Sequence, residues 1–208
     1  FVLFYNNRNI RRKMTSDVIL AYKEFCDKLT PEQAKKVCLL MHTQPVDDNG
    51  TDLPEVARIV CPEYKVYFSS RKLEPNELNH LFNVADVTIN IASNEGFGLG
   101  TCESLMAGTP IIVNVTGGLQ DQCGFKLKKY NGDKSGYSEE FLTEDDYSEI
   151  KSLHDWRKWE NNDDLTWGDW VKPVWPKTRA LQGSPATPYI FDDRADWVDV
   201  SEKIYDWY

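Results

Sequence analysis

The most constraining feature of this sequence is an apolar run that leads through a glycine-rich turn into a short helical pattern. Residues 87–91 (Val-Thr-Ile-Asn-Ile) predict a buried strand, and residues 99–107 predict a helix. Between them stand Gly96 and Gly98, with Gly100 just beyond. A strand, a glycine turn and a helix start bring backbone N–H groups together, and such groups bind anions. The sequence therefore predicts an anion site at this turn.

Two carboxylates bracket the same turn, Glu95 before the glycines and Glu103 after them. Carboxylates accept hydrogen bonds, so their place beside an anion site suits a ligand with both phosphate and hydroxyl groups, such as a sugar nucleotide. A simpler interpretation makes Glu103 a partner of the helix dipole, worth about 0.3–1 kcal/mol, and Glu95 a solvated loop residue. Neither simple interpretation explains why both carboxylates surround one turn.

Strand patterns alternate with helical patterns through the first 122 residues. Strands are expected over 1–5, 37–41, 66–68, 87–91 and 111–113, and helices over 16–29, 53–60, 75–84 and 99–107. Near-continuous apolar strands that alternate with helices are typical of an α/β, Rossmann-like parallel sheet with helices on both faces. Ligands of such sheets bind beyond the carboxyl ends of the strands. Four residues directly follow expected strands and are candidates to line that crevice: Arg8, Arg71, Glu95 and Thr116.

The pattern changes after residue 122. Residues 123–166 form a polar excursion, with helical character expected over 145–159, and residues 167–208 form an irregular C-terminal segment. Within that segment we expect a strand at 189–191, a helix at 198–208, and loops at Pro173, Pro176, Pro185 and Pro188. Five tryptophans between 156 and 175 favour a small aromatic core over an aromatic surface for a sugar acceptor.

Composition excludes several classes of partner. The 208-residue chain has a net charge of −9, whereas nucleic acids and anionic membranes select basic surfaces. No apolar run approaches the roughly 20 residues of a membrane span, and no signal peptide is visible. Five scattered cysteines without a CxxC pair are typical of reduced thiols in a cytoplasmic protein.

The sequence gives no support for a metal or a cofactor. No Asp-x-Asp triplet occurs, and the adjacent pairs at 47–48, 145–146, 163–164 and 192–193 fit solvated loops. The histidines at 42, 80 and 154 are isolated from one another, so a His-rich metal site is not expected.

The segment from Glu95 to Glu103 resembles the paired-glutamate motif of retaining glycosyltransferases with the GT-B fold, family 4 in particular. Residues 104–113 and 116–122 resemble that family's helix-to-strand continuation and its glycine-pair loop. Arg8 and Lys13 match its Arg and Lys after the first strand of the C-terminal domain. The resemblance covers residues 1–122, is weaker over 167–208, and is nearest to viral or phage members.

The resemblance implies a role for each matching residue. Arg8 and Lys13 would contact the donor's diphosphate, replacing the metal of other glycosyltransferases, and Glu95 and Glu103 would hold the donor sugar and the ribose. By position alone, the loop with Arg71 and Lys72 would meet the base. Backbone groups of four residues would hold phosphate and sugar: Gly96, Phe97, Gly98 and Leu99. Thr116 and Gly117 would line the far side of the pocket.

The implied activity is transfer of a sugar to an acceptor hydroxyl with retention at the anomeric carbon, without a protein nucleophile. The chain would be an excised donor-binding domain, inactive alone, whose missing N-terminal domain binds an acceptor of unknown kind. Two other classes stay open: an epimerase or phosphorylase of the same fold, and a non-catalytic nucleotide-sugar-binding module. A Rossmann dehydrogenase is disfavoured because no GxGxxG follows the first strand.

Overall fold

The computed structural model describes residues 1–132, 135–152 and 156–208. Its strands are β1 (Val2–Asn6), β2 (Cys38–His42), β3 (Val66–Ser69), β4 (Val87–Asn90), β5 (Ile111–Asn114), β6 (Lys126–Tyr130), β7 (Tyr137–Phe141), β8 (Leu165–Thr166), β9 (Val171–Val174), β10 (Thr178–Ser184) and β11 (Thr187–Arg194). Its helices are α1 (Thr15–Asp27), α2 (Pro31–Ala34), α3 (Leu53–Val60), α4 (Pro75–Val84), α5 (Leu99–Met106), α6 (Glu144–Lys151), α7 (Trp156–Glu160) and α8 (Trp197–Tyr205), with 3₁₀ turns η1 (Arg11–Lys13) and η2 (Gly117–Cys123).

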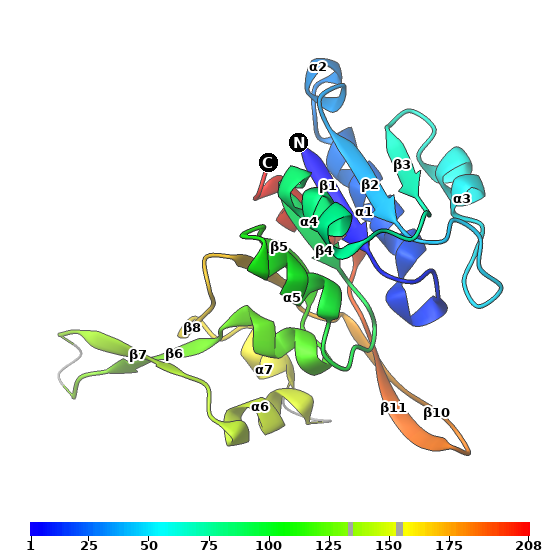
Figure 1. The fold of residues 1–208 in the computed structure, drawn as a ribbon. Coiled ribbons are helices and arrows are strands. Elements are labelled where there is room, and N and C mark those ends of the chain that lie inside the picture. Colours follow the sequence, from blue (N-terminus) through cyan, green and yellow to red (C-terminus); the bar gives the residue numbers. More distant parts are fainter. Residues whose placement is uncertain (133–134, 153–155) are drawn as a thin grey trace.

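Six parallel strands form the central sheet in the order β3-β2-β1-β4-β5-β9 (Figure 1). The chain runs outward from β1 through β2 to β3, then returns to the centre at β4 and runs the other way. The strand order therefore reverses between β1 and β4, which is where ligands of doubly wound sheets bind. The expected α/β sheet is confirmed, and the loops after β1 and β4 lie side by side at its carboxyl edge.

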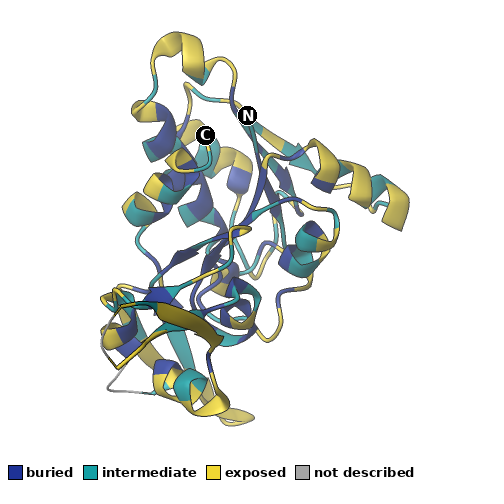
Figure 2. Ribbon diagram, turned by 90° about the vertical axis from the view of Figure 1, so that its left-hand side faces the viewer, coloured by how far each residue is buried: buried dark blue, intermediate teal, exposed yellow. Residues whose placement is uncertain are grey.

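Helices cover both faces of the sheet, which explains why its strands are apolar throughout. Leu3 and Tyr5 of β1 belong to the larger core, which α1, α3 and α8 share. Phe4 points the other way and meets Phe82 of α4, with ring centroids 5.3 Å apart. Figure 2 shows the buried residues gathered in the sheet and in the helix surfaces that face it. Alternate residues of a strand face opposite sides, so two helical layers bury the three central residues of β1.

The excursion after residue 122 packs on β5 and β9 and shares a second, smaller core with them. Strands β6, β7 and β8 form an antiparallel sheet, and α6 and α7 supply the helical character expected over 145–159. Trp159 is buried there with Phe125, whose ring stacks on Trp175 at 5.7 Å. The aromatic core expected from the tryptophans is therefore present, although Trp167 and Trp170 are 42% and 44% exposed.

The segment expected to be irregular is mostly regular. It supplies the sixth sheet strand β9, the antiparallel hairpin β10–β11 and helix α8, the last two overlapping the strand and helix expected there. The loop assignments of Pro173 and Pro188 are wrong, because these residues lie in β9 and β11. Both strands are edges, where the missing N–H of proline need not pair with a neighbour.

Candidate functional site

The loop after β1 carries the basic residues and is held in place by a buried asparagine. The side-chain amide of Asn9 donates to the carbonyls of Pro45 and Thr51 at 3.3 and 2.7 Å, joining this loop to the one after β2. The turn η1 follows, and Met14 closes it with φ 51° before α1 begins. A left-handed methionine is uncommon, so the surrounding contacts hold this turn in one conformation. The turn directs Lys13 into the protein.

Lys13 and Glu95 form a buried ion pair where the loops after β1 and β4 meet. The Nζ of Lys13 donates to Oε2 of Glu95, and their side chains are 8% and 10% exposed. Burial lowers the pKa of Lys13 below its ordinary value, while the bond to Glu95 favours the charged amine. The structure therefore brings together two predicted site residues that are 82 positions apart. Glu95 is not the solvated loop carboxylate of the simpler interpretation.

Arg12 lies beside the same pair and stays exposed at the surface. Its Nη1 donates to the carbonyl of Asn94 at 2.7 Å and lies 3.7 Å from Oε2 of Glu95. Its own carbonyl accepts from the N–H of Ser93 at 2.8 Å. The four basic residues between 8 and 13 signalled this loop, but only the fold shows which of them turn inward.

The glycine turn depends on close backbone packing at most of its positions. Gly98 has φ 88° and caps the N-terminus of α5, and a Cβ on Gly100 would lie 2.8 Å from the carbonyl oxygen of Asn6. Gly96 differs, because a Cβ there would meet nothing within 4 Å. Packing therefore requires the other two glycines, whereas Gly96 borders open space. Phe97 and Leu99 are exposed beside it.

The glycine pair after β5 packs onto the glycine turn after β4. A Cβ on Gly117, which has φ 49°, would lie 1.9 Å from the carbonyl oxygen of Glu95. A Cβ on Gly118 would lie 2.3 Å from the carbonyl oxygen of Gly96, and the Gly118 N–H donates to the backbone carbonyl of Glu95 at 3.0 Å. Only glycines permit this approach of two backbones. Gly117 thus lies beside Glu95, while Thr116 points elsewhere: it is buried, and its hydroxyl donates to Asp193 at 2.9 Å.

Glu103 lies in the second turn of α5, and the first turn contains no acidic residue. The helix-dipole interpretation of Glu103 is therefore wrong. Its exposed side chain instead borders a cavity of about 410 Å³ between α4 and α5. The other residues that line the cavity are mainly apolar: Leu73, Pro75, Leu78, Asn79, Phe82, Met106 and Ala107.

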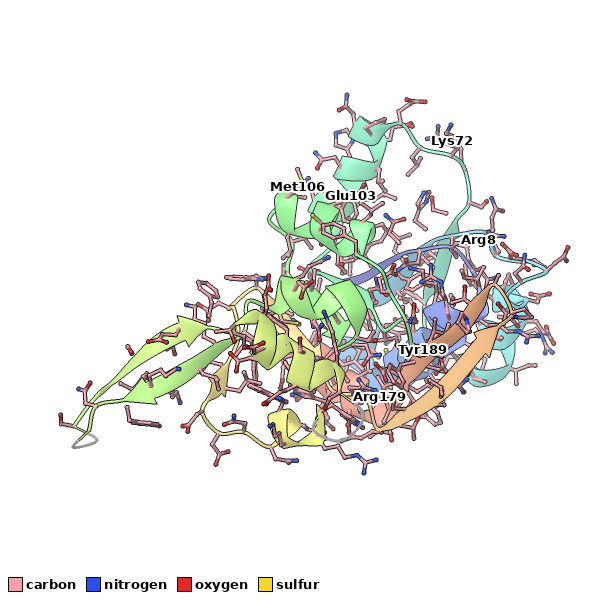
Figure 3. All side chains as sticks on the ribbon, turned by 90° about the horizontal axis from the view of Figure 1, so that it is seen from below. Arg8, Lys72, Glu103, Met106, Arg179 and Tyr189 are labelled. Atoms are coloured by element: carbon pink, nitrogen blue, oxygen red, sulfur yellow. The ribbon has the colours of Figure 1, made fainter. Side chains whose placement is uncertain are left out.

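Three basic residues that the sequence predicts to contact the donor are exposed: Arg8, Arg71 and Lys72. The Nε of Arg8 donates to Asp47 at 3.1 Å, and Nη2 of Arg71 donates to Glu77 at 2.7 Å. Figure 3 shows Lys72 on the loop that leads to α4, with Glu103 on the neighbouring helix and Arg8 on the same side of the molecule. The described contacts bring none of the three to the Lys13–Glu95 pair.

The expectation that the Asp192–Asp193 pair is solvated is wrong. Asp193 is 2% exposed in β11, where the guanidinium of Arg179 binds it at 2.5 and 3.0 Å. Arg179 and Asp193 stand opposite each other in the β10–β11 register. The sequence contains the two opposite charges, but predicting their pairing requires the register of the β10–β11 hairpin, which no sequence pattern indicated.

Among the residues that the structure describes, no group of three or more His, Cys, Asp or Glu side chains forms a candidate metal site. His42 is half-buried, its Nδ1 lies 3.1 Å from the Ser69 hydroxyl, and burial lowers its pKa. His154 lies outside the described residues. All five cysteines are free, and no described helix has the length and hydropathy needed to cross a membrane.

Comparison with known proteins identifies the family and the fold of the chain. Residues 6–169 match the model of a family described as "Family 4 Glycosyltransferase in conflict systems". No curated protein sequence matches the chain. A structure of apo OtsA is 18% identical over 58% of this chain and 30% of its own, with a TM-score of 0.51.

Two further structures resemble the chain to the same degree. The N-terminal domain of Candida albicans trehalose-6-phosphate phosphatase is 16% identical over 58% of this chain and 28% of its own, with a TM-score of 0.52. The α,α-trehalose-6-phosphate synthase of Burkholderia multivorans is also 16% identical, over 59% of this chain and 30% of its own, with a TM-score of 0.52. The chain spans less than a third of these structures, and the likeness concerns the fold alone. The family match covers most of the chain, and the chain therefore belongs to the family 4 glycosyltransferases of conflict systems, with a Rossmann-like domain of the GT-B type.

Proposed function

We propose that this chain forms the donor site of a glycosyltransferase, which binds a nucleoside-diphosphate sugar for transfer to an acceptor hydroxyl with retention. The observation that carries the proposal is the buried Lys13–Glu95 pair, which joins the loops at the reversal of strand order beside the glycine turn. A cation, open backbone space at Gly96 and a carboxylate lie together there. Family membership supports the same chemistry.

The basic loop after β1 is assigned to the diphosphate. When the glycosidic bond breaks, negative charge grows on the departing phosphate, and fixed cations bind that transition state more strongly than the ground state. Lys13 is buried, so solvent screens its charge less than that of exposed Arg8. Removing one such donor typically slows a reaction by about 10²–10³. In the unliganded chain the charge of Lys13 is paired with that of Glu95.

The two glutamates are assigned to different parts of the donor. Glu95 lies beside Lys13 at the entrance of the turn, where the sugar attached to the diphosphate would reach it. Glu103 lies beyond the turn in the cavity between α4 and α5, where its carboxylate would accept from the ribose hydroxyls. The apolar residues that line the cavity, Leu73 among them, would pack against the base. Exposed Arg71 and Lys72 directly precede Leu73 in the chain.

Retention fits a transfer without a protein nucleophile. The bond between the anomeric carbon and the phosphate oxygen breaks, the acceptor oxygen bonds to that carbon on the same face, and its proton passes to the departing diphosphate. The acceptor would be bound by a second domain of the complete enzyme. Arg8 and Lys13 would neutralise the leaving group, so the proposal requires neither metal nor cofactor.

Calorimetry with uridine, guanosine and adenosine diphosphates in EDTA tests this function. The chain should bind at least one of them, and Lys13→Met should remove that binding. The matched control is Lys35→Ala, because Lys35 is exposed on the C-terminal side of α2 and pairs only with Glu32 among the ion pairs described. Binding that requires Mg²⁺ or Mn²⁺ would overturn the metal-free assignment, and absence of nucleotide binding would overturn the donor site. In the full-length enzyme, the anomeric configuration of the transfer product, measured by NMR, separates retaining from inverting transfer.

A further inference from the structure

The strands β10 and β11 contain a buried ion pair next to the donor-site loops. Arg179 binds Asp193 through two hydrogen bonds, Nε to Oδ1 at 2.5 Å and Nη2 to Oδ2 at 3.0 Å. Their side chains are 9% and 4% exposed. Bidentate hydrogen bonds of this kind fix the orientation of both the guanidinium and the carboxylate. Figure 3 shows Arg179 on the hairpin, and Figure 1 shows the hairpin extending away from the central sheet.

Asp193 also contacts the segments that follow β4 and β5. Its N–H donates to the carbonyl of Ser93 at 2.8 Å, and its Oδ2 accepts from the Thr116 hydroxyl at 2.9 Å. Its carbonyl accepts from the amide of Asn114 at 2.7 Å, and the same amide donates to the carbonyl of Ala92 at 3.0 Å. Ser93 is two residues before Glu95, and Thr116 is one residue before Gly117. One buried residue therefore joins both glycine loops.

Arg179 is enclosed on its other sides. Its guanidinium lies 5.1 Å from the ring centre of Trp156 and 5.2 Å from that of Phe191. Its Nη1 donates to the carbonyl of Ser152 at the end of α6 at 2.9 Å. Aromatic faces and a carbonyl attract the cation, and together they hold the Arg179 guanidinium beside Asp193. The pair is thus anchored in the excursion as well as in the hairpin.

We propose that Asp193, held by Arg179, is a positioning residue for the donor site. It aligns Ser93 with Thr116, so that the carbonyl of Glu95 meets Gly117 and Gly118, and the Glu95 side chain stays directed at Lys13. The claim rests on the proposed function for its ligand, although the alignment itself is a property of the unliganded chain. Asparagine cannot reproduce these contacts, because Arg179 donates to both carboxylate oxygens, and in either orientation the side-chain NH2 of asparagine would face a donor of Arg179.

The test compares Asp193→Asn with Asp192→Asn, since Asp192 precedes it on β11 and pairs with exposed Arg194. Amide NMR spectra of both variants are recorded without ligand, and nucleoside diphosphate and sugar nucleotide binding are measured by calorimetry. Asp193→Asn should shift the amides of residues 93–97 and 116–118, leave those of α3 unchanged, and weaken binding about tenfold or more. Asp192→Asn should change neither measurement.

A second variant keeps the inference testable if Asp193→Asn does not fold. Thr116→Val removes only the hydroxyl that reaches Asp193 and leaves the ion pair with Arg179 intact. It should shift the amides of residues 93–97, on the other loop. Unshifted amides in a folded Asp193→Asn or Thr116→Val variant would overturn the positioning role, as would unchanged affinity of either for the sugar nucleotide. If the unaltered chain binds no nucleotide, the proposed function fails, while the amide shifts still decide the positioning claim.

Discussion

Removing Lys13 should cost stability through the carboxylate that it leaves behind. Loss of one partner of a fully buried ion pair costs about 3–5 kcal/mol, because the other charge stays buried. Glu95 keeps a second cation, since Arg12 lies 3.7 Å away, so the lower end of that range applies to Lys13→Met. For a domain of this size each kcal/mol lowers the melting temperature by about 2–4 °C, which predicts a loss of about 6–12 °C.

The double variant Lys13→Met/Glu95→Gln separates charge from packing. It removes the uncompensated carboxylate while keeping both side-chain volumes, so its free energy of unfolding should return to within about 1 kcal/mol of the unaltered chain. Urea unfolding of the unaltered chain, of Lys13→Met, of Glu95→Gln and of the double variant gives the coupling free energy between the two residues. Calorimetry on the same four proteins measures nucleoside diphosphate binding. Lys13→Met and the double variant should both lose diphosphate binding, although of these two only Lys13→Met should be less stable than the unaltered chain.

Two outcomes would refute this reasoning. A Lys13→Met chain as stable as the unaltered one would show that the ion pair does not form in solution. A double variant as unstable as the single one would show that the methionine disturbs packing, and that the charge of Glu95 contributes little.

Three further predictions follow from backbone space and thiol burial. Gly117→Ala should lower the melting temperature more than Gly108→Ala, because both have positive φ but only a Cβ at 117 would strike the carbonyl of Glu95; equal losses would refute the clash. Gly96→Ala should leave stability unchanged and weaken sugar-nucleotide binding in calorimetry, and unchanged binding would place the ligand elsewhere. Burial raises the pKa of Cys61 to about 11 from 9.0, so the stability that the buried, protonated thiol contributes is fully present below pH 9. It is lost as the pH rises through 11, with a loss of about 1 kcal/mol by pH 10. Urea unfolding at pH 8–10 should show a shallower decline for Cys61→Ala, and an equal decline would contradict the assignment.

The sheet was predictable because its signals are local. Each of the first five strands is a short apolar run, and each intervening helix has a clear periodicity or cap, as in the full agreement over α3 (Leu53–Val60) and α4 (Pro75–Val84). The sixth strand was not predictable, because β9 contains Pro173 and its pairing with β5 spans some 60 residues of chain. Strands β6 and β7 carry mostly charged and polar residues, so their pairing left no apolar alternation to recognise.

The site was predictable only where a motif marked it. The glycine turn made Glu95 a candidate and the family resemblance made Lys13 one, but their direct contact depends on β1 and β4 being neighbours in the sheet. No motif marked Asp193, because its proposed positioning role rests on long-range contacts with Ser93 and Thr116. Arg8, Arg71 and Lys72 were chosen by motif or by position, and their roles stay predictions.

The measurement that tests the central claim most directly compares two ligands on two variants. Calorimetry should show that Glu103→Ala weakens binding of the nucleoside diphosphate and of the sugar nucleotide alike, since the ribose is common to both. Glu95→Ala should leave affinity for the diphosphate nearly intact and weaken binding of the sugar nucleotide by about tenfold or more. If folded Glu95→Ala protein loses affinity for both ligands equally, then Glu95 does not contact the sugar, and the proposed division of the donor site between the two glutamates is wrong.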